Sequence, residues 1–468
     1  MPESDNASQK AWVLGITSLA SFMVALDTQV LTSALATIRA EFGAPMEILQ
    51  WTVTAFNLSF AVLLLTGAAL GDRFGRRRLF AAGILLFVVS SVACALSTGI
   101  LSLIAARIAQ GAGSALIMPL GMALLSTAFP REERARALGI FSGVVGVAVL
   151  AGPAIGGAIT ESLGWPWIFW INLPIGLFAA VMVIARLRES FGPSAKLDIF
   201  GLVLVAASAF ALVWGLLRGN GAGWTSPEVV TSLAAGMLLG AAFVAWELQT
   251  AAPMVPMRLF RSRALSSGIA ASFLLYGTLY SVLFLLPQFL QSALGYGPLG
   301  VGLRLLPWTA TLFVTAPIAG NVVNRIGERP LVVAGLSLQA SGLFWIAAII
   351  APDTAYVTMI APLIVAGIGV SMSMPAVQNA VLSSVSPVEM GKASGVFNMG
   401  RFLGGMFGVA LLVAVFSGTG GIGSAAGFST GFASAMLVAA LLSLLGALAG
   451  LFLPARKQVA SAPATQNA

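Results

Sequence analysis

Residues 71 to 78 read Gly-Asp-Arg-Phe-Gly-Arg-Arg-Arg, a charged turn between two long apolar runs. The Arg-x-Gly-x-Arg core of this turn returns in the second half of the chain, where residues 324 to 329 read Asn-Arg-Ile-Gly-Glu-Arg. A second repeated motif has nearly the same separation along the chain, since residues 111 to 119 and residues 367 to 375 share the pattern Gly-x-Gly-x-x-x-x-Met-Pro. The sequence therefore predicts an internal duplication. Repeated halves around a central site are an architecture of membrane transporters.

The composition is typical of a membrane protein. Of the 468 residues, 58% are hydrophobic and 9% are charged, whereas an ordinary soluble domain carries about 25% charged residues. The mean hydropathy is +0.97. A helix needs about 20 apolar residues to cross a hydrocarbon core of about 30 Å, and the sequence supplies many such runs. We predict an all-α polytopic membrane protein embedded in a lipid bilayer.

The residue counts exclude several kinds of chemistry. The chain has no histidine and a single cysteine, Cys94, so it cannot form a His/Cys metal site, a Ser-His-Asp triad or a disulfide. It also lacks the Gly-x-x-x-x-Gly-Lys-Ser/Thr loop that binds nucleotide phosphates. We therefore expect no enzyme activity, no metal and no cofactor. A membrane-embedded enzyme and a non-transporting receptor are the alternatives from another functional class.

Apolar runs between charged or Pro/Gly-rich segments predict fourteen membrane spans. The first seven are expected at 12–35, 49–70, 79–97, 101–127, 136–160, 166–186 and 198–217. The second seven are expected at 229–247, 263–290, 300–323, 331–350, 355–382, 391–416 and 430–453. Each repeated motif recurs eight spans further along the chain. A bundle of six helices accounts for six of these eight spans, so the seventh and eighth spans are inserted between two six-helix bundles, in a 6+2+6 arrangement.

The charge distribution predicts the orientation. An even number of spans places both termini on one side, and most of the 24 basic residues fall on that side, which the positive-inside rule identifies as the cytoplasm. The net charge of +8 therefore reflects topology and does not indicate nucleic-acid binding. The expected organisation is a cytoplasmic N-terminal tail (1–11), a first bundle (12–186), a linker with the two inserted spans (187–262), a second bundle (263–453) and a cytoplasmic C-terminal tail (454–468).

One acidic residue, Asp27, lies well inside a predicted span. At about 1.5 Å per residue, Asp27 and Arg107 lie at similar distances from the outer ends of their spans and can share one depth. Burial favours a neutral carboxyl and a nearby guanidinium favours a charged one, so an acid that alternates between these states can carry a proton. We predict that Asp27 and Arg107 form a proton-coupling site. The alternatives are a structural hydrogen-bonding role for Asp27 and, for Arg107, a side chain that reaches the outer interface.

Further polar and aromatic residues fall inside the predicted spans. Arg401 is too deep to reach the interface easily and its half has no intramembrane acid, so it serves either the structure or a central cavity. The other candidates for a substrate cavity are Phe56, Asn57, Gln110, Met118, Tyr276, Tyr280, Gln288, Gln378, Asn379 and Asn398. For each of these, helix packing is the alternative to ligand contact.

The charged turn has the residues of a gate. Its glycines allow a tight turn, and Asp72 can cap a helix N-terminus or pair with a nearby arginine, which would hold a single conformation. A turn that is basic only because it lies in the cytoplasm is the alternative. The predicted gating residues are Asp72, Arg73, Gly75, Arg76 and Arg77, with Arg325, Gly327 and Arg329 in the repeat.

These motifs resemble those of the major facilitator superfamily, and more narrowly those of its fourteen-span drug:proton antiporters, the EmrB/QacA-like group. The resemblance covers residues 11 to 453. The family's charged-turn motif is matched by Gly67, Asp72, Arg73, Gly75, Arg76 and Arg77, and its first-span acid motif by residues 26 to 30. The Arg-x-x-Gln-Gly-x-Gly motif is matched by Arg107, Gln110, Gly111 and Gly113.

The fifth span contains the antiporter motif Gly-Pro-x-x-Gly-Gly, matched by Gly152, Pro153, Gly156 and Gly157. Small residues four apart let helices approach closely and a proline bends the backbone, so packing alone also explains this motif. The motif's leading glycine is replaced by Ala148, and the sixth span begins with Trp-Pro-Trp in place of the family's Trp-Arg-Trp. The second half lacks the membrane acids of relatives that export dicationic drugs, which implies monocationic, neutral or zwitterionic lipophilic substrates.

The resemblance implies a proton-coupled secondary transporter that exports lipophilic drugs or toxic amphipathic compounds by alternating access. It also implies a monomer in the bacterial cytoplasmic (inner) membrane, with protons and small lipophilic substrates as its partners and the proton gradient in place of a cofactor. The alternative on the same fold is a dedicated exporter of a metabolite or antibiotic made by the host cell.

Overall fold

The computed structural model describes residues 3–192, 198–251, 253–385 and 390–454, and these ranges contain helices and no β-strand. The helices of the first half are α1 (Glu3–Phe42), α2 (Met46–Leu49), α3 (Trp51–Phe74), α4 (Arg76–Ala95), α5 (Ile100–Ala128), α6 (Arg131–Ser162), α7 (Trp167–Trp170) and α8 (Asn172–Arg186). The inserted helices are α9 (Ile199–Ala222) and α10 (Pro227–Gln249), followed by a 3-10 helix, η1 (Met257–Arg261). The helices of the second half are α11 (Arg263–Ser292), α12 (Pro298–Arg304), α13 (Leu306–Thr309), α14 (Thr311–Ile326), α15 (Glu328–Ile349), α16 (Tyr356–Leu382), α17 (Met390–Thr419) and α18 (Ala425–Leu451).

Thirteen helical segments of the described chain are long and apolar enough to cross a membrane. Two segments of α6, Gly143–Val149 and Ala151–Ser162, meet at a bend of 44° and supply the fourteenth span when they are taken together. The prediction of an all-α, fourteen-span membrane protein is confirmed. The observed helix limits differ from the predicted span limits mainly at α1. This helix runs from Glu3 to Phe42 and not only over 12–35, because the polar residues on both sides of its apolar run are also helical.

Each of the two repeated turns contains a glycine with a positive φ. Gly75 follows α3 with a φ of +107°, and Gly327 follows α14 with a φ of +87°. Glycine adopts this region without the steric cost that a side chain would add. A glycine with positive φ at equivalent places in the two halves supports the internal duplication.

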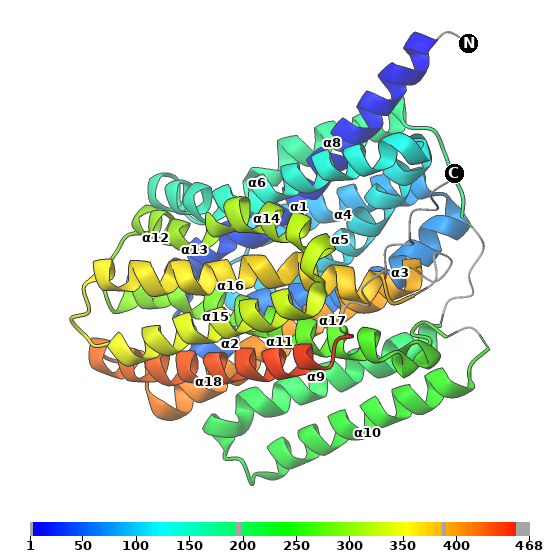
Figure 1. Ribbon diagram of the computed structural model, residues 1–468. Helices are drawn as coiled ribbons and strands as arrows, with labels where there is room; N and C mark the ends of the chain where they lie inside the picture. Colours follow the sequence, from blue (N-terminus) through cyan, green and yellow to red (C-terminus); the bar gives the residue numbers. More distant parts are fainter. Residues whose placement is uncertain (1–2, 193–197, 252, 386–389, 455–468) are drawn as a thin grey trace, which may run out of the picture.

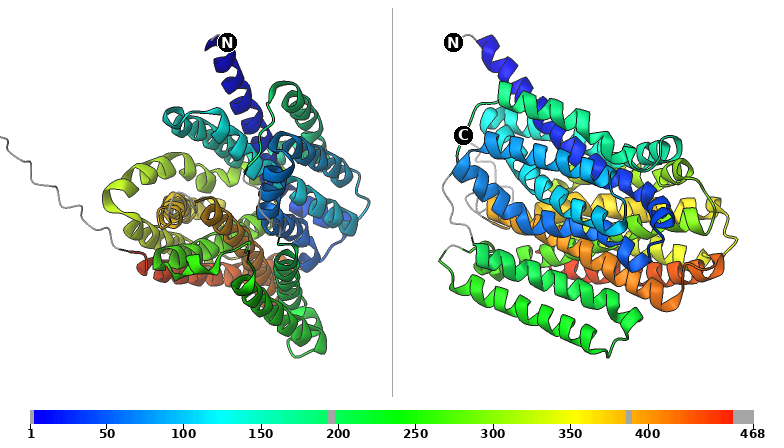
Figure 2. Two further views of the ribbon diagram at one scale, coloured as in Figure 1. Left: turned by 90° about the vertical axis from the view of Figure 1, so that its right-hand side faces the viewer. Right: turned by 180° about the vertical axis from the view of Figure 1, so that it is seen from behind.

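The two halves lie side by side, and the start of α1 and the end of α18 lie toward the same end of the bundle (Figure 1). We call this end the tail end and the opposite one the far end. The α9–α10 hairpin lies at the edge of the bundle (Figure 2), where α9 packs against α3 of the first half and α17 of the second. The hairpin therefore contacts both halves.

Among the described residues, the hydrogen bonds that join the first half to the second lie toward the far end. Arg39 Nη2 donates to Ser292 Oγ at 2.8 Å, and Gln291 Nε2 donates to the Ser33 carbonyl at 2.7 Å. Two further bonds of this kind run from Ser417 Oγ to Glu47 Oε1 (2.5 Å) and from Leu299 N to Glu161 Oε2 (2.9 Å). These bonds hold the far end closed.

Candidate functional site

A buried ion pair lies in the first half, between α1 and α5. Arg107 Nη1 contacts Asp27 Oδ2 at 2.5 Å, and the side chains of Arg107 and Asp27 are 1% and 0% exposed. Buried charges are costly unless they are paired and hydrogen-bonded. The structure thus places the two predicted proton-coupling residues at one depth and in direct contact, and Arg107 does not reach the outer interface.

The second oxygen of Asp27 is held by two amide groups. Gln110 Nε2 and Asn172 Nδ2 each donate to Asp27 Oδ1 at 2.8 Å. Both amides also donate to Ser91 Oγ, at 2.8 Å and 3.2 Å, and Ser91 in turn donates to the Phe87 carbonyl of its own helix at 2.9 Å. Side chains from α4, α5 and α8 therefore orient the carboxylate of α1.

Arg107 has partners besides Asp27. Its Nε donates to the Thr52 carbonyl at 3.0 Å, and its Nη1 donates to Gln110 Oε1 at 2.5 Å. Its guanidinium carbon lies 4.3 Å from the centre of the Phe56 ring, a distance suited to a cation–π contact. Because of these contacts, Arg107 stays bound in place if Asp27 becomes neutral.

Asn172, Ser91 and Thr52 surround the ion pair and were not among the residues predicted from the sequence. The sequence shows only that Asn172 is an amide residue within a predicted span, and it does not show which neighbouring helix the side chain faces. Asp27, Arg107, Gln110, Asn172 and Ser91 form one hydrogen-bonded group, which we call the Asp27 cluster. Gln110, predicted as a cavity residue, therefore lies in this cluster, and it is 0% exposed. Cys94 donates to its amide oxygen at 3.7 Å.

A small cavity of about 20 Å³ adjoins the ion pair. It is lined by residues of both halves, namely Thr28, Gln29, Leu31, Thr32, Leu35, Val53, Phe56, Asn57 and Arg107 from the first and Tyr280, Leu283 and Phe284 from the second. The amide of Asn57 is 1% exposed, and both its oxygen and its nitrogen lack a hydrogen-bond partner. An unpartnered amide at this place is a ready hydrogen-bonding group for a ligand.

Arg401 of α17 lies against aromatic side chains. Its guanidinium carbon is 4.5 Å from the Tyr276 ring centre and 5.2 Å from that of Phe402, and its Nη2 lies 3.5 Å from Tyr280 Oη. Its Nε is buried without a hydrogen-bond partner. The Phe402 ring in turn lies 4.3 Å from Phe60 of the first half. The structure thus brings three predicted cavity residues, Arg401, Tyr276 and Tyr280, into one cluster next to the boundary between the halves.

The remaining predicted cavity residues do not line the cavity beside the ion pair. Gln288 is buried and donates to the Phe284 carbonyl of its own helix at 2.8 Å, and Met118 packs against the first-half core. Asn398 donates to the Ser394 carbonyl, Asn379 donates to Glu328 Oε1 at 2.7 Å, and Gln378 is exposed.

The charged turn is an ordered structure. Asp72 Oδ1 accepts from Arg76 Nη2 at 2.7 Å and from Arg76 Nε at 2.8 Å. The turn docks on the segment that follows α8, since the Arg77 N–H donates to Glu189 Oε1 at 2.8 Å and the Gly192 N–H donates to the Asp72 carbonyl at 3.1 Å. Of the two roles considered for Asp72, the structure shows pairing with an arginine.

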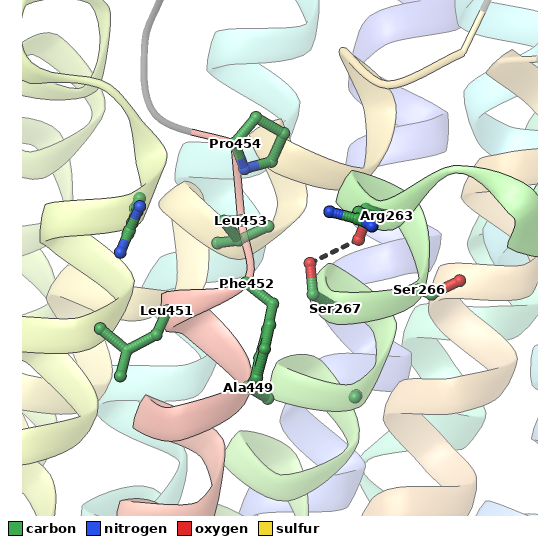
Figure 3. A pocket seen from close by; sticks show the side chains of 10 residues that line it. Arg263, Ser266, Ser267, Ala449, Leu451, Phe452, Leu453 and Pro454 are labelled. Atoms are coloured by element: carbon green, nitrogen blue, oxygen red, sulfur yellow. Dashed lines mark hydrogen bonds between the residues drawn. The ribbon is translucent and has the colours of Figure 1, made fainter.

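The other gating residues have separate environments. Arg73 is exposed and lies 5.2 Å from the Phe74 ring centre. A Cβ at Gly67 would lie 2.5 Å from the Ala115 carbonyl oxygen, so this glycine serves the close approach of α3 to α5. In the repeat, Arg329 lines a cavity of about 950 Å³ at the tail end, together with Arg263 and the end of α18 (Figure 3). The side chain of Arg325 lies outside the described residues.

The glycines of the antiporter motif lie at two helix interfaces. Side chains at Gly152 and Gly156 would collide with Gln29 and Val30 of α1, directly after Asp27. A side chain at Gly157 would collide with the backbone of Pro298, where α12 of the second half begins. This span therefore links the helix that carries Asp27 to the closed far end.

Comparisons with known sequences agree with this architecture. The family model of the Major Facilitator Superfamily matches residues 17–409 and 268–468. Cephamycin export protein CmcT of Amycolatopsis lactamdurans is 35% identical over 459 residues, 97% of this chain and 94% of that protein. Multidrug resistance protein Stp of Mycobacterium tuberculosis is 33% identical over 401 residues, 85% of this chain and 74% of that protein. The tetracenomycin C resistance and export protein of Streptomyces glaucescens is 33% identical, covering 83% and 73%.

Solved structures share the fold at low sequence identity. A POT family transporter in complex with a thioalcohol-conjugated peptide superposes with a TM-score of 0.71 at 15% identity, covering 93% of this chain and 94% of that one. A bacterial homolog of the human lysosomal transporter Spinster, inward-facing and unoccupied, gives a TM-score of 0.66 at 16% identity, covering 95% and 98%.

Two repeated bundles of membrane helices with a cavity at their boundary are the architecture of a secondary membrane transporter. The chain belongs to the Major Facilitator Superfamily and, within it, to the drug:proton antiporter family that its motifs predict.

Proposed function

We propose that this multi-pass membrane protein exports amphipathic small molecules in exchange for protons across a bacterial cytoplasmic (inner) membrane. The observation that carries the proposal is the buried Asp27–Arg107 pair beside a cavity that both halves line. Relatives named for multidrug resistance and for antibiotic export support the direction of transport. The tail end is cytoplasmic on this proposal, because it carries both arginine-rich turns.

The exchange of substrate for protons follows from the two charge states of Asp27. With Asp27 ionised, the pair is neutral overall, and a cation can occupy the cavity once the two halves move apart and widen it beyond its present volume of about 20 Å³. With Asp27 protonated, the charge of Arg107 is no longer balanced, and a guanidinium that borders a poorly solvated cavity repels a cationic substrate. Proton entry from outside therefore expels the substrate, and proton release inside resets the carrier. Coupling of this kind is a difference in binding free energy between two states.

The Asp27 cluster suits a site that must exist in both states. The amides of Gln110 and Asn172 each combine donors with an acceptor. The Asn172 oxygen has no hydrogen-bond partner in the present arrangement. After a rotation of the amide, this oxygen can accept a hydrogen bond from the O–H of a neutral Asp27, so the protonated carboxyl keeps a hydrogen-bond partner.

Alternating access requires the closed far end to open. The contacts that must separate include the close approach of Gly157 to Pro298 and that of Gly302 to Pro153, both between α6 and α12. The ordered Asp72–Arg76 turn then acts as the gate at the tail end. We propose that the transporter works as a monomer without a bound cofactor, since the proton gradient supplies the energy.

The substrate class follows from the lining of the cavity. None of its lining residues is acidic, and its polar groups are the free Asn57 amide, Gln29, two threonines, the Tyr280 hydroxyl and Arg107. This lining suits monocationic, neutral or zwitterionic lipophilic compounds better than dications. A dedicated exporter of one antibiotic is the second candidate, favoured by the cephamycin export protein, which matches this chain over nearly its full length.

The test is proton movement evoked by substrate in proteoliposomes that contain a lumenal pH dye. The wild type is compared with Asp27→Asn across a panel of lipophilic cations, neutral drugs and β-lactams. A matched control is Asp353→Asn, an exposed acid in the loop between α15 and α16.

We expect the wild type and the control to move protons, and Asp27→Asn to bind drug without moving protons. Response to one antibiotic class alone would select the dedicated exporter. Drug flux without proton movement in the wild type would overturn antiport and leave a facilitator on the same fold.

A further inference from the structure

A second cluster of acids lies at the tail end of the inserted hairpin, away from the ion pair of the first half. Asp198 directly precedes α9, and Glu247 lies in the last turn of α10. A Cβ placed on Gly201 would lie 2.6 Å from Asp198 Oδ2 and 2.9 Å from Glu247 Oε1, so these two carboxyl oxygens face one small space. Since both oxygens lie within about 3 Å of the same point, they are close neighbours across that space.

The two acids have unequal surroundings. Asp198 accepts from the Gly201 N–H at 2.8 Å and from Trp246 Nε1 at 2.9 Å, and it is partly exposed. Glu247 is 3% exposed, and its Oε2 accepts one bond, from the Val255 N–H at 3.0 Å. Its Oε1 has no donor. A buried carboxylate oxygen without a donor, facing a second carboxylate, is the arrangement that one shared proton satisfies.

The described cations near this pair do not form an ion pair with it. Charged groups near this end of the elements packed around the pair are Arg73 on α3, Arg258 and Arg261 on η1, and Arg263 on α11. Among the described residues, no ion pair includes Asp198 or Glu247. The side chains of Lys196 and Lys392 lie outside the described part.

A divalent cation fits the site less well than a proton. Calcium takes 6–8 oxygen ligands and magnesium requires octahedral coordination. The searched part of the chain holds no group of three or more acidic, histidine or cysteine side chains that could bind a metal ion.

We propose that Asp198 and Glu247 form a proton-binding site in which one proton is shared between the two carboxyl groups, with the proton on Glu247 and the charge on Asp198. The protonated pair joins the beginning of α9 to the end of α10. Loss of the proton leaves two facing carboxylates, one of them buried, and they repel each other.

The pair also positions the segment that leads into the second half. Glu247 holds the Val255 N–H, and the Val255 side chain, 1% exposed, packs in one cluster with Val62 of α3 and with Val396 and Met399 of α17. The proton therefore stabilises the docking of the hairpin and its linker on both halves. This site does not depend on the transport cycle proposed above.

The test is infrared difference spectroscopy of the purified full-length protein as the pH is raised. An Asp27→Asn background removes the carboxyl of the first-half site, and Glu247→Gln and Asp198→Asn are added to it one at a time. Glu228→Gln is the matched control, because Glu228 lies at the opposite end of α10 and pairs with Arg218 at 2.9 Å.

We expect a protonated-carboxyl band that disappears as the pH rises, that is absent in Glu247→Gln and in Asp198→Asn, and that is unchanged in the control. Thermal stability should fall with rising pH in the background protein and stay flat in Glu247→Gln, whose amide donates permanently to Asp198. The absence of a titrating band, or a band that survives both substitutions, would overturn the site. Stability restored at high pH by Mg²⁺ or Ca²⁺ in the background protein but not in Glu247→Gln would show a cation site and would also overturn the proposal.

Discussion

The two halves share a duplicated turn but hold their intramembrane arginines in different ways. Arg107 of the first half is 1% exposed and contacts a carboxylate, an amide oxygen, a backbone carbonyl and an aromatic ring. Arg401 of the second half lies against aromatic rings, with one long contact to a tyrosine hydroxyl and a free Nε. Arg107 neutralises the charge of a carboxylate, whereas Arg401 has a nitrogen that is free to form a further hydrogen bond.

This difference indicates that the duplication preserved the scaffold and not the charge chemistry. Gly75 and Gly327 keep a positive φ at equivalent places in the turns of the two halves. The proton-binding chemistry proposed for the transport cycle belongs to the first half alone. Substitutions in the two halves should therefore have different consequences.

The largest effect is expected from Arg107→Ala. It leaves Asp27 as an unpaired buried carboxylate, and breaking a buried pair from one side costs about 3–5 kcal/mol. We expect the free energy of unfolding in detergent to fall by this amount, with no substrate-evoked proton movement. The double variant Asp27→Asn/Arg107→Ala should recover part of the stability, because no buried charge is stranded. A double variant less stable than Arg107→Ala would contradict the assignment of the cost to Asp27.

The next effect is expected from Asn172→Ala, since Asn172 acts on protons only through Asp27. A hydrogen bond to a charged group contributes about 1.5–3 kcal/mol, and this donor favours the ionised carboxylate. Because the rotated amide also bonds to a neutral Asp27, through an uncharged bond of about 0.5–1.5 kcal/mol, its loss disfavours the ionised form only by the difference, and the pH dependence of antiport should move to higher pH by about one unit.

The control for Asn172→Ala is Asn398→Ala, because Asn398 donates to a carbonyl of its own helix. A purely structural role for Asn172 would lower stability and leave the pH profile in place. A shift of the profile toward lower pH would contradict the direction of the hydrogen bond.

Much of the fold could be predicted from the sequence because lipid imposes strong rules on it. A span must be long and apolar, and basic residues concentrate on one side, so fourteen helices could be found one by one. The meeting of Asp27 and Arg107 could be predicted by counting depth along two helices. Asp72 had two possible partners from its position alone, and only the folded turn shows that it pairs with Arg76.

The lateral contacts of the helices could not be predicted in the same way. Asn172 and Ser91 join the Asp27 cluster because α8 and α4 turn those faces inward, and uniformly apolar spans carry no periodic signal for that rotation. The same limit explains Gln378, which is polar and within a span yet exposed. The carboxyl pair at the base of the hairpin joins residues 198 and 247, which become neighbours only when α9 and α10 pack together.

A smaller effect is expected from Gly157→Ala, which tests the contact between the two halves at the far end. The added methyl group meets the backbone of Pro298, and overpacking of this kind costs about 1–3 kcal/mol. The cost applies only to the conformation closed at the far end, so the population should shift toward an open far end.

Labelling can detect this shift, because the only native cysteine is buried. The variant Ser33→Cys, at a position that is 0% exposed, should react faster with a maleimide in the Gly157→Ala background. Gly302→Ala should act alike, and Gly143→Ala on the same helix as Gly157 should have no effect, since nothing lies within 4 Å of its added methyl. Equal labelling rates in all three backgrounds would show that this interface does not control closure.

The smallest effect on stability is expected from Arg401→Gln. Cation–π contacts contribute about 0.5–2 kcal/mol, and the substitution leaves no buried anion without a partner, in contrast to Arg107→Ala.

Arg401→Gln should also affect substrate binding. Because Arg401 lies beside Tyr280, which lines the cavity, the substitution should change the apparent affinity for zwitterionic relative to cationic drugs, and Arg401→Lys should restore part of the difference. The number of protons moved per substrate should stay the same, since no carboxylate of the described residues pairs with Arg401. A lower proton-to-substrate ratio in Arg401→Gln would mean that both arginines take part in coupling, and the division of roles between the two halves would then be wrong.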